Sequence, residues 1–134
     1  MTGYVCDTHA LIWHLSRDSR LSPAASAALS SADAGQIRIF VPTIVVVETI
    51  YLSEKARVPA AIVDRILHLL RIPDGAYAPV ALDMAIADEL RAISRETIPE
   101  LPDRVIAATA RRLKLPLITR DRAITQSGAI PVLW

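Results

Sequence analysis

The feature that most constrains the fold is a short apolar run near the start of the chain that ends at an acidic residue. Residues 3–6 include the β-prone side chains Tyr4 and Val5, and a helical pattern of apolar residues begins directly after Asp7. This order predicts a strand that ends at Asp7 and continues into a helix over residues 8–15. In an open parallel α/β sheet, ligands bind at the carboxyl ends of the strands. Asp7 therefore stands where a functional site is expected, provided that the rest of the chain builds such a sheet.

The remainder of the chain alternates between strand and helix patterns. Ser22 followed by Pro23 marks a helix start, because Ser is a preferred N-cap and Pro is favoured at the first helical position. Pro42 argues against a long strand through the apolar run after it, so that run is predicted to be helical. Strands are predicted over residues 3–6, 37–41, 77–80, 115–119 and 130–133, and helices over residues 8–15, 23–30, 42–54, 59–71, 83–94, 103–114 and 121–126. This alternation predicts a three-layer α/β/α fold with a central, mostly parallel sheet of about five strands.

Length and composition limit the class of protein. We expect one domain over residues 1–134, long enough to bury its own core, and a composition of 52% hydrophobic and 22% charged residues is that of a globular protein. A single cysteine excludes an internal disulfide and a cysteine-based metal site. The chain shows no signal-peptide pattern, and its uncharged apolar run over residues 39–47 is too short to cross a bilayer. We therefore expect a cytoplasmic protein that does not contact a membrane.

Four acidic residues are the candidates for chemistry. Asp7, Asp103 and Asp121 each precede a predicted helix, where an Asp taken alone is explained by N-capping. Glu48 lies inside an apolar helix that is expected to be largely buried, so its carboxyl must be protonated, paired or bound to a cation. Carboxylates that converge raise one another's pKa, and a divalent metal ion reverses this effect by favouring the ionised form. An all-oxygen ligand set selects Mg²⁺ or Mn²⁺ rather than zinc. We expect Asp7, Glu48 and Asp103 to lie within coordination reach of one ion, with Asp121 nearby.

Charge is distributed unevenly, although the net charge is only +1. Residues 72–102 hold six acids against two arginines, whereas residues 103–122 hold six basic residues against two acids. The pattern fits either two solvated helix faces or a basic rim that attracts phosphate. The arginines nearest to the acids in sequence are Arg104, Arg120 and Arg122, and each could contact a phosphate group or form an internal ion pair.

The histidines and tryptophans are given structural roles. The three histidines are scattered without zinc-site spacing, so we expect them to be structural or surface residues. Trp13 is predicted to lie in the core of its helix, and no aromatic platform for stacking bases is evident.

The acids and their surroundings resemble a known family, the PIN-domain ribonucleases, in the small stand-alone form that is the toxin of VapBC toxin–antitoxin pairs. The resemblance covers nearly the whole chain. Its parts are residues 5–13 (VCDTHALIW), Glu48 in the helix after the second strand, residues 101–110 (LPDRVIAATA) and residues 117–121 (LITRD). Each part alone is weak, but their order and spacing in a chain of this size are specific.

The resemblance implies a site and an activity. Four residues match the acidic quartet of the family: Asp7, Glu48, Asp103 and Asp121. The family binds Mg²⁺ or Mn²⁺ with this quartet and hydrolyses phosphodiester bonds of single-stranded RNA. Thr119 matches a Ser/Thr position that supports the site by hydrogen bonding, and Thr8 is expected to act in the same way. Residues 98–102 depart from relatives that carry a His-rich loop there.

The helices over residues 42–54 and 59–71 carry more apolar residues than one buried stripe requires. Either both helices are sandwiched inside a small domain, or the surplus forms a groove for an amphipathic helix of a partner. The family resemblance favours the groove and implies a cognate antitoxin protein bound there, together with a twofold homodimer.

Other classes fit the sequence less well. A phosphoacceptor receiver domain, which would be a non-catalytic metal-binding regulator, should carry a lysine at a late strand end, and neither Lys55 nor Lys114 stands there. A phosphatase with an Asp nucleophile should carry a second Asp two residues after Asp7, where the chain has His9. Within the nucleases, a housekeeping PIN-domain protein that processes RNA remains the alternative to a toxin.

Overall fold

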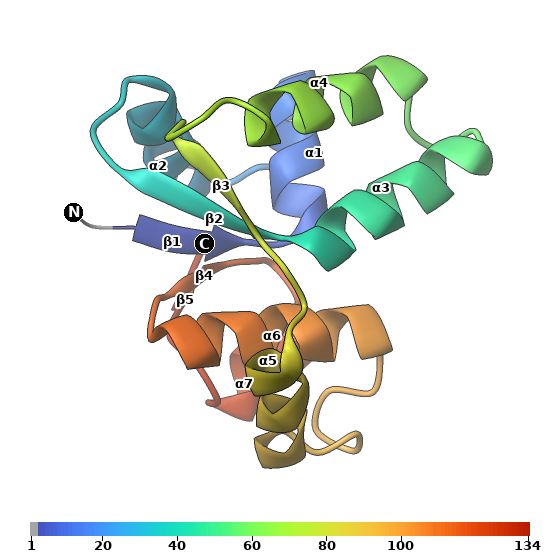
Figure 1. Cartoon of the computed structure of the whole chain (residues 1–134), viewed down its shortest axis with the longest axis vertical. Coiled ribbons are helices and arrows are strands. Elements are labelled where there is room, and N and C mark those ends of the chain that lie inside the picture. Colours follow the sequence, from blue (N-terminus) through green and yellow to red (C-terminus); the bar gives the residue numbers. More distant parts are fainter. Residues whose placement is uncertain (1–2) are drawn as a thin grey trace.

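The computed structural model describes residues 3–134 and contains a five-stranded sheet between two layers of helices (Figure 1). The strands are β1 (Gly3–Cys6), β2 (Arg38–Pro42), β3 (Tyr77–Val80), β4 (Leu117–Ile118) and β5 (Val132–Leu133). They lie in the order β3-β2-β1-β4-β5, and every neighbouring pair is parallel. The predicted α/β class, with its layered architecture, is therefore confirmed.

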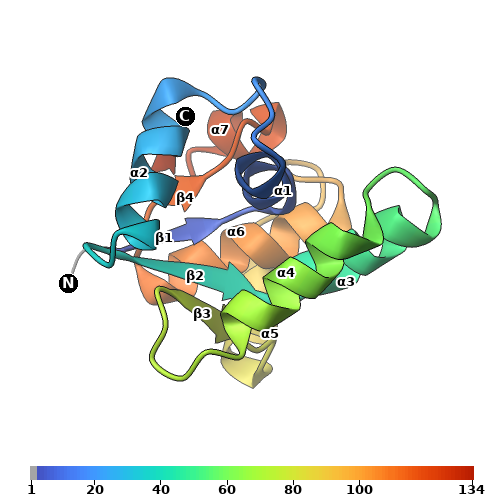
Figure 2. The same cartoon turned by 90° about the horizontal axis from the view of Figure 1, so that it is seen from above.

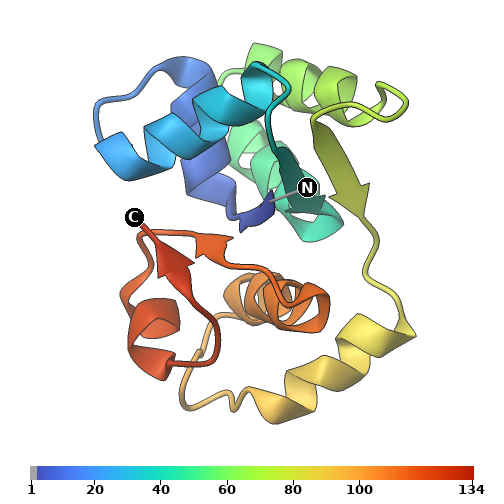
Figure 3. The ribbon, with the colours of Figure 1, turned by 90° about the vertical axis from the view of Figure 1, so that its left-hand side faces the viewer.

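Helices cover both faces of the sheet. The first half of the chain supplies α1 (Thr8–Ser16), α2 (Pro23–Asp33), α3 (Thr43–Glu54) and α4 (Ala60–Leu70), and the second half supplies α5 (Met84–Glu89), α6 (Leu101–Leu113) and α7 (Arg122–Ser127). Figures 1 and 3 show α1, α2 and α4 on one side of the sheet and α5, α6 and α7 on the other. The helices α3 and α4 pack against each other, and their connecting loop extends away from the sheet (Figure 2).

The strand order reverses between β1 and β4. From β1 the chain builds outward through β2 to β3, and it then returns to place β4 and β5 on the other side of β1. Such a reversal is the topological switch point of an open α/β sheet, where the carboxyl ends of two strands diverge and leave a crevice for a ligand. Asp7 follows β1 at this point, and Asp121 follows β4 after two intervening residues.

Most predicted elements are present, with shifts at their ends that have physical causes. Ser22 caps α2 as predicted, because its Oγ accepts the Ala25 N–H at 3.1 Å. The single helix predicted over residues 83–94 is instead α5 followed by a 3₁₀ turn at Leu90–Ala92. The helix predicted to begin at residue 103 begins two residues earlier, with Pro102 in its first turn, where a missing N–H costs nothing.

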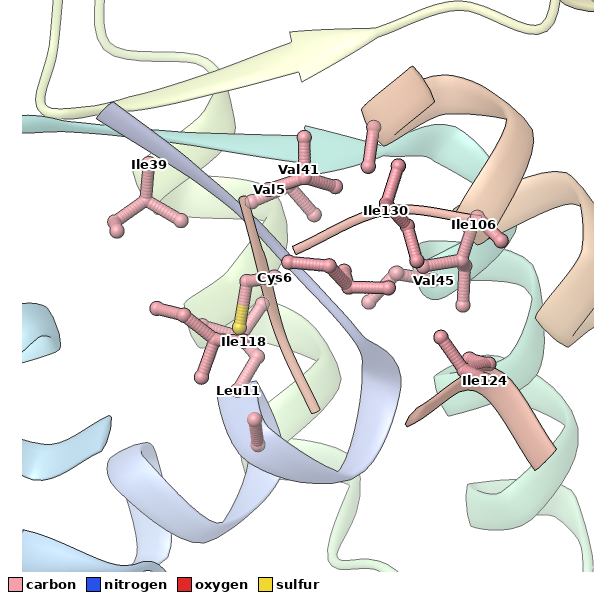
Figure 4. Close-up of a cluster of buried hydrophobic side chains, with 14 of the residues drawn as sticks. Val5, Cys6, Leu11, Ile39, Val41, Val45, Ile106, Ile118, Ile124 and Ile130 are labelled. Atoms are coloured by element: carbon pink, nitrogen blue, oxygen red, sulfur yellow. The ribbon is translucent and has the colours of Figure 1, made fainter. Parts of the chain in front are cut away.

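The core packs against both faces of the sheet. Figure 4 shows buried side chains of β1 and β2, including Val5 and Val41, packed with Leu11 of α1 and Ile106 of α6. Each aliphatic side chain of this size stabilises the fold by about 1.5–3 kcal/mol when it is fully buried. This packing fixes α1 and α6, and therefore fixes the acids that these helices position. Within residues 3–134, the helices are all too short or too polar to traverse a bilayer.

Two leucine-sized positions on α6 test this account of the core. Ile106 is 0% exposed and Leu101 is 60% exposed. We expect Ile106→Ala to lower the free energy of unfolding by about 2–5 kcal/mol, because it leaves a cavity. Leu101→Ala, the matched control, should change it by less than about 0.5 kcal/mol. Urea unfolding followed by circular dichroism measures both, and equal effects would show that Ile106 is not a core residue.

Candidate active site

A pocket of about 530 Å³ lies at the switch point and collects all four predicted acids. Asp7 comes from the end of β1, Glu48 from α3, Asp103 from the first turn of α6, and Asp121 from the junction of β4 and α7. The other residues that line the pocket are Thr8, His9, Ala10, Trp13, Arg20, Glu100, Pro102, Arg120 and Trp134. Residues that are far apart in the sequence therefore meet at one edge of the sheet.

Asp7 is the most buried of the acids. Its Oδ1 accepts the Ala10 N–H at 2.9 Å and caps α1, and its Oδ2 accepts a hydrogen bond from the Thr119 hydroxyl. Burial raises the pKa of Asp7 to about 6, against the opposing effect of the hydrogen bonds from Thr119 and Ala10. The negative charge of Asp121 adds to the rise. The carboxylate is thus held in one orientation at an electrostatic cost.

The pKa of Asp103 is raised even more than that of Asp7. Burial, together with the negative charges of Asp121, Glu48 and Asp7, raises its pKa to about 7. Asp103 does not cap its helix, because α6 begins at Leu101, so the N-capping alternative is wrong for this residue. Asp7 and Asp121, by contrast, do cap helices.

Two threonines hold the other acids. The Thr8 hydroxyl donates to Glu48 Oε1 at 2.5 Å, and Thr119 Oγ1 accepts the Asp121 N–H at 3.0 Å. Asp121 Oδ1 also accepts the Ile124 N–H at 2.8 Å. Thr119 thus bridges Asp7 and Asp121 through its single hydroxyl group.

Glu48 is less buried than the sequence suggested. The expectation of a largely buried helix is wrong for α3, where only Val45 and Thr49 are fully buried. The helix runs beyond the edge of the sheet, so much of its surface faces solvent. Glu48 is half-buried and borders the open pocket.

The three arginines expected near the site have different surroundings. Arg120 lines the pocket with the acids. The Arg104 guanidinium instead donates to the carbonyl oxygens of Leu90 at 3.0 Å and Ile93 at 2.8 Å, so it ties α6 to the 3₁₀ turn. Arg122 does not line this pocket but borders a second hollow beside α7, which Arg120 and Trp134 also line. Because the Arg104 side chain is engaged in these bonds, we do not assign it a role in RNA binding.

Aromatic and charged residues that the sequence did not indicate also line the pocket. His9 and Trp13 lie one helical turn apart on α1, with ring centroids separated by 5.6 Å, so helical periodicity could have placed both beside Asp7. Trp134 and Arg20 come from distant parts of the chain, and no local pattern links them to the acids. Glu100 is a fifth acid, three residues before Asp103.

The donor set suits a hard divalent cation, but its arrangement corrects one expectation. Among residues 3–134, no three His, Cys, Asp or Glu side chains are placed to hold one metal ion together. In these side-chain positions, Asp7, Glu48 and Asp103 are therefore not within reach of one ion together, and hydrogen bonds hold Asp7 and Glu48 in their present orientations. Mg²⁺ commonly keeps several waters and uses only one or two carboxylates, so this all-oxygen set still fits such an ion.

An open parallel sheet with clustered acids at its switch point places this chain among the α/β proteins whose ligand site lies at the carboxyl ends of the strands. The PIN domain family model matches residues 4–128, so the chain belongs to the PIN domain family. The resemblance drawn from the sequence is thereby confirmed. No curated protein matches the chain in sequence.

Solved structures share this fold. VapBC2 from Rickettsia felis, bound to a DNA fragment from its promoter, matches with a TM-score of 0.71 at 13% identity, over 98% of this chain and 97% of that one. DNA-bound VapBC from Salmonella typhimurium matches with a TM-score of 0.70 at 16% identity, over 98% of this chain and 97% of that one. A toxin–antitoxin complex from Klebsiella pneumoniae matches with a TM-score of 0.64 at 22% identity, over 95% of this chain and 94% of that one.

The raised pKa values predict how stability depends on pH in the absence of divalent ions. The folded protein holds the Asp7 and Asp103 protons to higher pH than the unfolded chain does. Their contribution to stability is therefore complete below about pH 4 and is lost as the pH rises through 6 and 7. Asp103→Asn should have a higher Tm than the parent protein at pH 8, and the difference should shrink towards pH 4.5.

Differential scanning calorimetry in EDTA at both pH values measures this effect. Asp64→Asn is the matched control, because Asp64 is exposed on α4 and does not line the pocket. A Tm of Asp103→Asn equal to that of the parent protein at pH 8 would contradict the electrostatic account.

Proposed function

We infer that this chain is a metal-dependent endoribonuclease of the cytoplasm and the toxin of a type II toxin–antitoxin pair. The observation that carries the inference is the meeting of Asp7, Glu48, Asp103 and Asp121 in one pocket of a PIN domain. Mutual repulsion of carboxylates packed this closely raises the free energy of the folded protein, and a bound cation relieves this repulsion. An acidic site of this kind is suited to hydrolysis assisted by a metal ion rather than to covalent catalysis.

Hydrolysis of a phosphodiester needs an activated water and compensation for the negative charge that develops on phosphate. A bound Mg²⁺ or Mn²⁺ supplies both, by lowering the pKa of a bound water and neutralising phosphate oxygens. Asp7 and Asp103 would hold the ion, because burial and neighbouring charge favour the gain of a cation most at these two carboxylates. Glu48 and Asp121 would complete the site, through water where they do not reach the ion directly.

The residues around the acids have supporting tasks. Thr119 fixes the carboxylate of Asp7 and the backbone of Asp121, so both acids keep their orientation when the local charge changes. Thr8 fixes Glu48 in the same way. We assign RNA as the substrate, in its single-stranded form, because this is the substrate that the family resemblance implies.

The partner surface is proposed on α3 and α4. Val47 and Tyr51 are each 58% exposed and lie one helical turn apart on α3, beside the exposed Ile50. Such a stripe fits the apolar face of an amphipathic antitoxin helix. Two of the similar solved structures are VapBC complexes and a third is a toxin–antitoxin complex, which supports this assignment. We also propose a homodimer, and an antitoxin arginine that takes the place of the cation beside Asp7 and Asp103.

The nuclease assignment predicts the behaviour of two variants. The purified chain, free of antitoxin, should cleave RNA with Mg²⁺ or Mn²⁺ and not with EDTA. Asp7→Asn and Asp103→Asn should each lose cleavage by at least about 10²-fold, since each removes a ligand of the ion. Both variants should retain the circular dichroism spectrum of the parent protein.

Gel mapping of the cut ends on structured RNAs measures activity and target together. Asp64→Asn is again the control and should cleave normally, because its side chain lies away from the pocket. Full activity of either site variant would refute the assignment of the acids.

The partner assignment predicts where an antitoxin protects the chain. Co-expressed antitoxin should slow hydrogen exchange over residues 44–70, and Tyr51→Glu should weaken the complex by at least about tenfold, because it buries a charge in an apolar contact. Met84→Glu is the control, since Met84 is 82% exposed on α5, on the other side of the sheet. Unchanged exchange over residues 44–70 on binding would mean that the partner docks elsewhere.

A further inference from the structure

Trp13 carries two arginine side chains over its ring at the border of the acidic pocket. The Cζ of Arg120 lies 4.6 Å from the ring centroid, and the Cζ of Arg20 lies 4.8 Å from it. Trp13 itself is only 6% exposed and packs with Ile12 and Val58, so its position is fixed by the core. Arginine on an aromatic face is an attractive cation–π arrangement that leaves the edge of the guanidinium free to donate hydrogen bonds.

The two arginines differ in what their edges contact. Arg20 is paired with Asp18, through Nε to Oδ1 at 3.0 Å and Nη2 to Oδ2 at 2.7 Å. Arg120 is exposed, and no residue in the described part of the chain forms a hydrogen bond or an ion pair with its side chain. The planar face of the Arg120 guanidinium therefore contacts the Trp13 ring, while its N–H groups remain available to donate hydrogen bonds.

The position of Arg120 makes this arrangement significant. It stands between Thr119 and Asp121 at the carboxyl end of β4, and it lines the same pocket as the four acids. A guanidinium beside several carboxylates is drawn towards them by simple Coulomb attraction. The contact with Trp13 opposes that movement and keeps the guanidinium of Arg120 over the indole ring.

We propose that Arg120 binds a backbone phosphate of single-stranded RNA next to the phosphodiester that is cut, and that Trp13 is a positioning residue that holds Arg120 there. The proposal rests on the proposed nuclease function, because it names a second contact for the same substrate. A strand that enters an acidic pocket needs a fixed cation for the phosphate that does not meet the metal ion. Arg20 adds positive charge at the same ring, although Asp18 offsets part of it.

Stacking of a base on Trp13 is the competing use of this aromatic group. The ring is almost fully covered, by the two guanidinium groups and by Trp134, whose centroid lies 6.0 Å away. A base could reach Trp13 only by displacing these neighbours, whereas a phosphate reaches Arg120 with no such change. The geometry therefore favours a phosphate contact over a stacking platform.

Binding to an RNA that is not cut tests the proposal without relying on catalysis. Asp103→Asn is the background, and the probe is a fluorescent single-stranded RNA of mixed sequence followed by anisotropy in EDTA over a range of KCl concentrations. Adding Arg120→Ala should weaken binding by about tenfold and lower the slope of log Kd against log salt by about 0.7. Arg112→Ala, an exposed arginine in the last turn of α6, is the charge-matched control and should leave both values unchanged.

A double-mutant cycle tests the role of Trp13. Trp13→Leu should weaken binding when Arg120 is present and have no further effect when Arg120 is already alanine. A general loss of structure would weaken binding in both backgrounds, so the cycle separates positioning from folding. Trp13→Phe, which retains an aromatic face in the core, should preserve most of the affinity.

The outcomes separate this proposal from the nuclease assignment. An affinity and salt slope that Arg120→Ala leaves unchanged would overturn the phosphate contact, even if the parent protein cleaves RNA. RNA binding that depends on Arg120, in a parent protein that does not cleave with Mg²⁺ or Mn²⁺, would overturn the nuclease assignment and support the phosphate contact. An additive effect of Trp13→Leu and Arg120→Ala would overturn the positioning role.

Discussion

The hydrogen bond from the Thr119 hydroxyl to the Asp7 carboxylate links the ends of β1 and β4, the two strands between which the strand order reverses. Thr119 is fully buried and also accepts the Asp121 N–H, while Asp7 caps α1 through Ala10. One hydroxyl group thereby connects the carboxyl ends of β1 and β4 and the starts of α1 and α7. The bridge fixes Asp7 and Asp121 relative to each other, while Glu48 and Asp103 are brought to the same pocket by α3 and α6.

The fold holds these carboxylates together against their mutual repulsion. Burial raises the pKa values of Asp7 and Asp103, and neighbouring acids raise them further. The aliphatic core on both faces of the sheet supplies the stability that offsets this cost. A positive group that enters the pocket relieves the repulsion, and the protein gains stability through whatever binds there. A metal ion, an arginine side chain or a proton can each meet this requirement, and they differ mainly in what chemistry follows.

Much of the fold could be predicted because the local signals agreed with the tertiary structure. β1 and β3 have the predicted limits, and Ser22 and Pro23 open α2 as their chemistry requires. The site was predictable as far as it depends on strand ends, since Asp7 and Asp121 follow parallel strands in sequence. The start of α6 was misplaced because Asp is such a strong capping signal that it concealed Pro102 as a first-turn residue.

The remainder depends on contacts that no local pattern encodes. Arg104 follows directly after Asp103 in sequence, yet its side chain reaches the carbonyl oxygens of Leu90 and Ile93 on another segment. Arg20 and Trp134 meet at Trp13 only because α1, the loop after it and the last strand converge in space. Proximity in sequence was therefore a poor guide to which basic residues face the acids.

The helix α3 carries Glu48 towards the pocket and Val47 and Tyr51 towards solvent, all within residues 47–51. A change that tilts or shifts the backbone of α3 therefore moves the outer side chains and the Glu48 carboxylate together. If a partner covers the outer side, a shift of α3 would alter the partner contact and the position of the Glu48 carboxylate at the same time. The chain and its partner would then change together during evolution. A chain combined with the partner from another lineage would bind it less tightly through α3.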